Sequence, residues 1–208
     1  MSHPNVTEAE MAKCMAAIQQ GEGKNGRNIP AMTFIPDVAS FLKQHDMKIE
    51  VLFQNLATMR EKYRFMSKRL QDTRVAIMAK VPENERTLKT VQHLMKKAAD
   101  DEEVKASFPL ADSVYVDATV SPDQGTVYLW LGANVLLEYP YAEAEQLLKE
   151  QNAAAQEKLS ELSSDIMFLR DQITTTEVNV SRCWNFDVTQ RAAKKEEEAA
   201  NAEIQKEN

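Results

Sequence analysis

Cysteine and histidine are scarce in this sequence, and their shortage excludes two kinds of stabilising site. The two cysteines, Cys14 and Cys183, are far apart, and the N-terminus lacks the basic start and apolar run of a secretory signal. We therefore expect no disulfide framework and a reducing compartment, which favours the cytoplasm and leaves the nucleus open as an alternative. The three histidines are isolated and no CxxC or HxxxH spacing occurs, so the sequence predicts no metal site.

Motifs that carry catalysis are also missing. The sequence contains no GxxxxGK[ST], GxSxG or HExxH, and its runs of carboxylates have the helical spacing that is typical of solvated faces. A formal net charge of -7 argues against non-specific binding to nucleic acid, which needs a surplus of basic groups. No apolar run approaches the roughly 20 residues that span a bilayer. The sequence therefore predicts no enzyme, no cofactor, no nucleic-acid partner and no membrane association.

Glycine and proline mark the organisation of the chain. Three of the five glycines fall in GEGKNGRN, which is typical of a linker, so residues 1–28 are expected to form a flexible segment. Residues 37–107 contain no glycine and one proline, Pro82, and residues 141–208 contain neither. Two long helical segments are therefore expected to flank a short, turn-rich insert.

Heptad spacing runs through both helical segments, because apolar residues recur at alternating steps of four and three. The first register shifts by four residues beside Pro82, where we expect a bend or break of the helix. The first seam comprises Val38, Leu42, His45, Ile49, Leu52, Leu56, Met59, Tyr63, Met66, Leu70, Thr73 and Ile77. The second comprises Leu148, Asn152, Ala155, Leu159, Leu162, Ile166, Leu169, Ile173, Thr176, Val180 and Cys183. A cysteine on such a seam is interpreted as a small core residue rather than a nucleophile.

The segments together define one domain at residues 29–190. Its expected parts are a helix at about 37–104, a β insert at about 107–139 and a helix at about 141–190. Alternatively, Asp46 caps a separate main helix and the preceding residues form a short helix of their own, which leaves the geometry of the helix ends open. The charged tail, residues 191–208, is expected to be solvated helix or disorder.

The insert has the alternation of strands, with short strands predicted at about 107–110, 113–120, 126–131 and 134–139. The run TVYLWL is apolar or aromatic on both faces, so both faces must be covered. A sheet this small cannot cover itself within one chain, and association with other subunits is the natural inference.

Three long stretches give the sequence a family resemblance. PLADSVYVDATVSPDQGTVYLWLGANVLLEY, FLRDQITTTEVNVSRCWNFDV and IPAMTFIPDV resemble the α-class subunits of the prefoldin family, over about residues 29–188. The resemblance implies a mainly α fold, a long antiparallel coiled-coil hairpin whose inserted β-hairpin region assembles into an intersubunit β-barrel. It also implies a heterohexamer with one further α-class and four β-class subunits. Such complexes capture non-native actin and tubulin without ATP and pass them to the cytosolic chaperonin.

Two sets of residues are candidate sites on this interpretation. Either the apolar residues near the free helix ends close the coiled coil, or part of them stays exposed and binds unfolded clients. The candidate assembly residues are Val114, Val116, Val127, Leu129, Trp130, Leu131, Val135 and Leu137. The candidate client-binding tip comprises Phe34, Ile35, Val38, Phe41, Leu42, Trp184, Phe186 and Val188.

A structural coiled-coil tether or trafficking scaffold is the alternative function. The two-faced apolar insert argues against a plain tether, because a tether has no need of strands that demand covering. Co-purification separates the two, since a defined hexamer with five other subunits supports prefoldin and a homodimer supports a tether.

Overall fold

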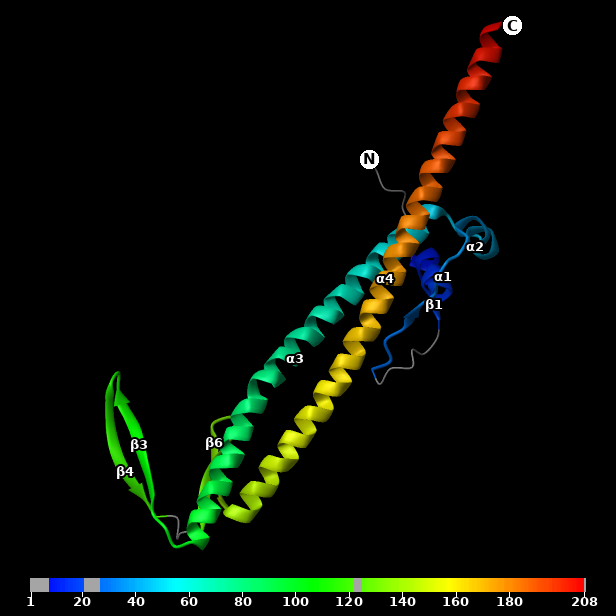
Figure 1. The fold of residues 1–208 in the computed structure, drawn as a ribbon. Helices are drawn as coiled ribbons and strands as arrows, with labels where there is room; N and C mark the ends of the chain where they lie inside the picture. The colour runs from blue at the N-terminus through cyan, green and yellow to red at the C-terminus, as the bar shows by residue number, and fades with distance from the viewer. Residues whose placement is uncertain (1–7, 21–26, 122–124, 208) are drawn as a thin grey trace. The chain divides into compact units, whose positions relative to one another are not determined.

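Two long helices dominate the structure, a computed structural model that describes residues 8–20, 27–121 and 125–207 (Figure 1). Helix α3 runs over Ile49–Ala99 and helix α4 over Tyr141–Glu207, and four short strands lie between them in the sequence. The prediction of a mainly helical chain with a small inserted β region is confirmed.

The chain divides into two compact units, and both long helices contribute to each. One unit contains residues 1–72 together with residues 163–208, and the other contains residues 73–162. We call them the helix-end unit and the hairpin unit, because the first holds the chain ends and the second holds the four strands.

Within the helix-end unit the two long helices are antiparallel. The ring of Phe53 on α3 lies 6.2 Å from that of Trp184 on α4. Arg64, further along α3, contacts Glu177, which comes earlier in α4. Because the α4 number falls as the α3 number rises, the helices run in opposite directions, as the sequence predicted.

The described part of the N-terminal segment is folded, so the expectation of a flexible segment was wrong for these residues. Helix α1 covers Glu8–Ile18, and strand β1 (Gln19–Gln20) pairs antiparallel with β2 (Ala31–Met32). Cys14 and Ile18 are fully buried and stand four residues apart, so they share one face of α1. Their burial in the core of this part of the chain holds α1 in place. The GEGKNG stretch, residues 21–26, lies outside the described residues.

A short helix precedes α3, which is the arrangement that the sequence left open. Helix α2 covers Val38–His45, and the Asp37 carboxylate caps it by accepting hydrogen bonds from the amides of Ala39 and Ser40. Asp46 ends α2 in a left-handed conformation (φ 48°) rather than beginning α3, which starts at Ile49. The single helix expected at 37–104 is therefore interrupted.

Of the bend or break expected at Pro82, the break is absent, because α3 is helical on both sides of this residue. Proline removes the amide that would bond the carbonyl of Met78, four residues earlier. Both Pro82 and Met78 are exposed, so water can reach the carbonyl that lacks its helical donor. Helix α3 instead ends at Ala99, earlier than expected, and β3 begins at Val104.

The four strands form two separate antiparallel hairpins. Strand β3 (Val104–Ala111) pairs with β4 (Val114–Val120), and β5 (Thr126–Gly132) pairs with β6 (Val135–Pro140). The β5–β6 turn consists of two residues, Ala133 and Asn134, which both have positive φ. This is the backbone that matches the twist of a tight hairpin.

Each unit has its own apolar core. In the helix-end unit the predicted seam residues Leu52, Leu56 and Tyr63 are buried against Leu169 and Cys183 of α4. The same core takes in residues from α1, from the chain before α2 and from the start of α2, namely Cys14, Ile18, Ile29, Met32, Ile35 and Val38. The core of the hairpin unit contains Val91, Leu129, Ala144 and Leu148.

Candidate functional site

The β5–β6 hairpin has one face that the long helices partly cover and one face that is exposed. Leu129 is buried and Val127 is partly buried, because both pack against Val91, Ala144 and Leu148 of the long helices. The next residues along the strand point the other way, as the alternation of a strand requires. On that outer face Tyr128, Trp130 and Leu136 are exposed, and Trp130 lies opposite Leu136 in the register. The outer face therefore offers aromatic and aliphatic side chains to solvent.

The β3–β4 hairpin separates apolar from polar side chains even more clearly. On its polar face Ser107 donates a hydrogen bond to the carboxylate of Asp117, 2.7 Å away, and Lys105 lies opposite Thr119. The opposite face is apolar, and its larger side chains Phe108, Val116 and Val120 are exposed. It comprises Val104, Ala106, Phe108, Val116, Ala118 and Val120. An isolated two-stranded hairpin is marginally stable in water, so this face needs a cover.

The candidate assembly residues fall into two groups. Leu129 and Val127 pack against the helices of their own chain, whereas the other six are exposed. The exposed group is Val114, Val116, Trp130, Leu131, Val135 and Leu137. Each of the two hairpins has only two strands, so its outer edges carry unpaired backbone groups in the described residues. Exposed apolar faces beside open edges are the features of a surface that another chain completes.

The candidate tip residues lie in the helix-end unit, and the core covers some of them. Ile35 and Val38 are buried, while Phe41, Leu42 and Phe186 are partly buried against the same core. Phe34, Trp184 and Val188 remain exposed, with Trp184 at 57%. The guanidinium of Arg182 lies 4.9 Å from the centre of the Phe34 ring. The set therefore divides into an inner part that closes the core and an outer part that solvent reaches.

Sequence reasoning missed a row of polar residues on α4 that holds the chain before α2. Asp165, Gln172 and Asn179 are spaced by seven residues, so they lie along one face of the helix, and all three are buried. Gln172 accepts a hydrogen bond from the amide of Met32 at 2.7 Å, and Asn179 accepts one from the amide of Ile35 at 3.0 Å. A polar row at heptad spacing beside an apolar seam was the available signal.

Three further contacts fix the same stretch of chain. Asn179 also donates to the carbonyl of Thr33 at 2.8 Å, and Arg182 donates to the carbonyl of Pro36 at 2.6 Å. The carboxylate of Asp165 pairs with the guanidinium of Arg27 at 2.5 Å. We call residues 27–36 the strap and name Asp165, Gln172 and Asn179 the polar ladder. The ladder binds mainly backbone groups of the strap, and its members come from positions some 140 residues further along the chain.

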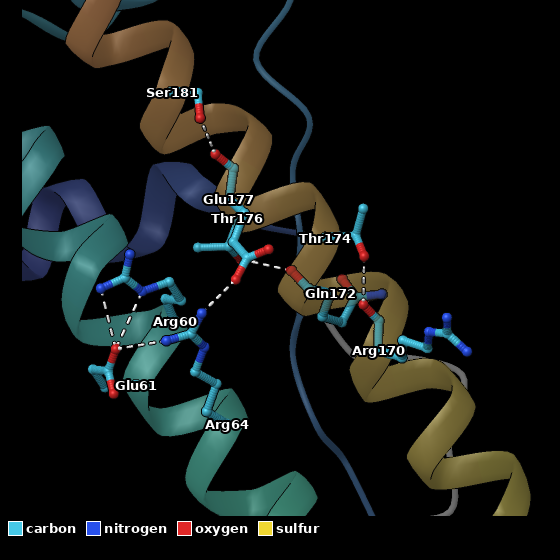
Figure 2. A network of polar contacts seen from close by, with 9 residues as sticks. All are labelled: Arg60, Glu61, Arg64, Arg170, Gln172, Thr174, Thr176, Glu177 and Ser181. Atoms are coloured by element: carbon cyan, nitrogen blue, oxygen red, sulfur yellow. Dashed lines mark hydrogen bonds and ion pairs between the residues drawn. The ribbon is translucent and has the colours of Figure 1, made fainter.

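Figure 2 shows ion pairs and helix hydroxyls in the region of Gln172, one member of the ladder. Arg64 on α3 contacts Glu177 on α4 at 2.6 Å, in a pair that solvent reaches and that therefore contributes little stability. The hydroxyl of Thr176, which is fully buried on the predicted seam, donates to the carbonyl of Gln172 at 2.6 Å. A polar residue is thus tolerated in the core because its own helix satisfies it.

The two thiols do not have the environment of a reactive site. Cys14 and Cys183 are fully buried in one core, and burial raises the pKa of each to about 11. A thiol with a raised pKa is a poor nucleophile at neutral pH, because little thiolate is present. The described residues contain no group of three or more His, Cys, Asp or Glu side chains that could hold a metal ion. None of the helices, over the described ranges, is long and apolar enough to cross a membrane.

Comparison with known proteins identifies the family. Residues 63–185, more than half of the chain, match the family model described as "Prefoldin subunit". The chain belongs to the prefoldin family. It is 38% identical over 188 residues to "Prefoldin subunit 3" of Homo sapiens, which covers 85% of this chain and 95% of that protein. It is 41% identical over 171 residues to "Prefoldin subunit 3" of Drosophila melanogaster, which covers 82% of this chain and 86% of that protein.

Prefoldin membership settles the general class of the protein. The family is one of chaperones rather than of enzymes, and its members are subunits, so this chain assembles with other prefoldin subunits.

The letters GEGKNG match the glycine spacing of a dinucleotide-binding loop, but such loops open a helix directly. Here the next described element is β2 (Ala31–Met32), so the structural context of that motif is lacking.

Proposed function

We propose that this chain is one subunit of a heterohexameric prefoldin, with one further α-class and four β-class subunits, and that it acts in the cytoplasm. The complex captures non-native actin and tubulin without ATP and passes them to the cytosolic chaperonin. The observation that carries the proposal is the pair of hairpins with exposed apolar faces. The family match and the likeness to proteins named prefoldin subunit 3 support it.

The hairpins support assembly through the area they would bury. Phe108 and Trp130 are more than half exposed, and their hairpins also expose Val116 and Leu136. Burial of apolar surface contributes about 25 cal/mol per Å², so covering several such side chains at once stabilises a complex by several kcal/mol. The outer strand edges allow strands of neighbouring subunits to extend each hairpin into a closed barrel.

The exposed part of the candidate tip supports client capture. Phe34, Trp184 and Val188 lie within one unit and are about half exposed each. Exposed aromatic and aliphatic side chains bind the apolar stretches that an unfolded protein presents. The exposed charged residues that follow Arg191 keep this end of the chain hydrated.

The test is reconstitution with the five partner subunits, followed by native mass spectrometry and an assay of client aggregation. A hexamer that suppresses aggregation of unfolded actin or tubulin in the absence of ATP is the expected result. A homodimer that ignores the partner subunits contradicts the proposal and supports the tether. A hexamer without holding activity contradicts only the chaperone part.

A further inference from the structure

The strap and the polar ladder match each other in spacing. The ladder residues Gln172 and Asn179 are seven apart, which is about 10.5 Å along a helix at 1.5 Å per residue. Their partners, the amides of Met32 and Ile35, are three residues apart, which is about 9–10 Å in an extended chain. The two distances are nearly equal, so residues seven apart on α4 can each bond to the strap at residues three apart.

The strap's side chains follow the same period of three. Ile29, Met32 and Ile35 are buried in the core of the helix-end unit, while Phe34 and Pro36 between and beyond them are exposed. Pro30 and Pro36 favour an extended chain before them, since proline disfavours the helical conformation of the preceding residue. The groove along α4 thus takes an apolar side chain from each of Ile29, Met32 and Ile35, and a backbone amide from the last two.

This mode of recognition depends little on sequence. The side-chain oxygens of Gln172 and Asn179 accept from backbone amides, which every residue except proline supplies, and the pockets take ordinary aliphatic side chains. Both ladder side chains are buried beneath the strap, so its removal would expose them together with the apolar side chains around them, and covering that apolar surface again favours an extended chain.

We propose that the strap is an internal stand-in for a client, and that an extended apolar stretch of a non-native polypeptide replaces it on the polar ladder. This inference rests on the client-holding function proposed above. The strap shields the groove when no client is present, and exchange of one extended chain for another keeps Gln172 and Asn179 paired throughout.

Hydrogen exchange tests the exchange of chains directly. The assembled complex is incubated with reduced, carboxymethylated α-lactalbumin, a permanently unfolded polypeptide, and amide exchange is followed by mass spectrometry. In the free complex the amides of Met32 and Ile35 are expected to exchange slowly, because both donate to buried acceptors. Binding of the unfolded chain is expected to accelerate exchange across residues 27–36 while α3 stays protected.

A variant of the strap tests the same proposal through the affinity of the complex for the unfolded chain. Ile35→Ala removes a fully buried anchor of the strap without touching the groove, so it is expected to raise affinity for the unfolded chain about fivefold or more. Ile35→Val provides a milder change in the same direction should the first variant fail to fold. Gln44→Ala, at an exposed position of α2, is the matched control and is expected to leave the affinity unchanged.

The outcomes separate this inference from the proposed function. If the unfolded chain binds while residues 27–36 stay fully protected and Ile35→Ala leaves the affinity unchanged, the stand-in role is overturned and client holding stands. If the assembled complex does not bind the unfolded chain, both are overturned.

Discussion

Tyr63 on α3 donates a hydrogen bond from its phenolic hydroxyl to the backbone carbonyl of Pro30 in the strap, 2.8 Å away. The ring itself is fully buried in the core of the helix-end unit. One residue thus joins the first long helix to the strap through a polar contact and an apolar one. The strap is consequently held by three elements: by β1 through strand pairing, by α3 through Tyr63 and by α4 through the polar ladder.

Removing only the hydroxyl of Tyr63 measures how much its hydrogen bond to Pro30 contributes to the free energy of unfolding. Tyr63→Phe keeps the ring but leaves the Pro30 carbonyl without this donor, so the free energy of unfolding is expected to fall by about 1 kcal/mol. Chemical denaturation of the variant and the parent protein gives the difference. No change would mean that water replaces the hydroxyl at no cost.

Alkaline pH should weaken the fold of this unit. Burial raises the pKa of Tyr63 from the ordinary 10.0 to about 12, so between these values the unfolded chain loses the phenolic proton while the folded chain keeps it. The contribution of Tyr63 to stability is therefore complete below pH 10 and is lost as pH rises towards 12. Denaturation midpoints of the parent protein should fall between pH 10 and pH 12, and the midpoints of Tyr63→Phe should fall less steeply. Equal slopes would contradict the assignment to Tyr63.

The two thiols should be protected by the fold. Cys14 and Cys183 are fully buried with pKa values near 11, so a thiol reagent at pH 8 is expected to modify neither in the native protein and both after denaturation. Rapid native modification of Cys14 would show that α1 opens readily, since this residue is the one that α1 contributes.

Assembly should depend on the apolar face of β3–β4 and not on its polar face. Val116→Asp places a charge on the exposed apolar face and is expected to abolish the hexamer while the helical content is kept. Thr119→Asp, on the polar face of the same strand, is the matched control and should assemble normally. Native mass spectrometry and circular dichroism provide the readouts. A hexamer that contains Val116→Asp would remove this hairpin from the interface.

Substitution of Leu129 is expected to lower the stability of the chain itself rather than its assembly, because the Leu129 side chain packs against the helices of its own chain. Leu129→Ala is expected to lower the stability of the hairpin unit by about 2–5 kcal/mol, whether or not partners are present. Thermal unfolding of the chain alone tests this. An unchanged midpoint would return Leu129 to the list of residues that serve assembly only.

Client holding should depend on the exposed part of the tip. Trp184→Ser removes an aromatic side chain that is mostly exposed, so the hexamer and its helicity should persist while suppression of client aggregation weakens severalfold. Asn185→Ser, at the exposed neighbouring position, is the control. Full holding activity in a Trp184→Ser hexamer would show that this end of the chain is not a client site. Phe41→Ser is less informative, because Phe41 packs against the core.

The elements that sequence predicted well are those whose signal is local. The seam through Leu52, Leu56 and Tyr63 follows from periodicity alone, and the strands follow from alternation between turn residues. The burial of Leu129 under its own helices was beyond such reasoning, since a strand that is apolar on both faces does not reveal which partner covers which face.

The strap and α1 escaped prediction because their partners are distant in the sequence. Gln172 and Asn179 resemble ordinary polar positions of a solvated helix until the amides of Met32 and Ile35 are placed beside them. Their burial is a tertiary effect, set by a chain about 140 residues away. Glycine content likewise suggested a linker for the N-terminal segment, although Cys14 and Ile18 anchor its helix.

The heptad spacing of the polar ladder also constrains the path of whatever lies on it. Positions seven apart on a straight α-helix drift by about 20° around its axis with each repeat, in the left-handed sense. Asp165 and Asn179 are two repeats apart, so a chain that follows the ladder from one to the other turns by about 40°. We therefore expect the strap to follow a left-handed path along α4 rather than a straight one. A flat, rigid peptide of the same length would leave the ladder at one end.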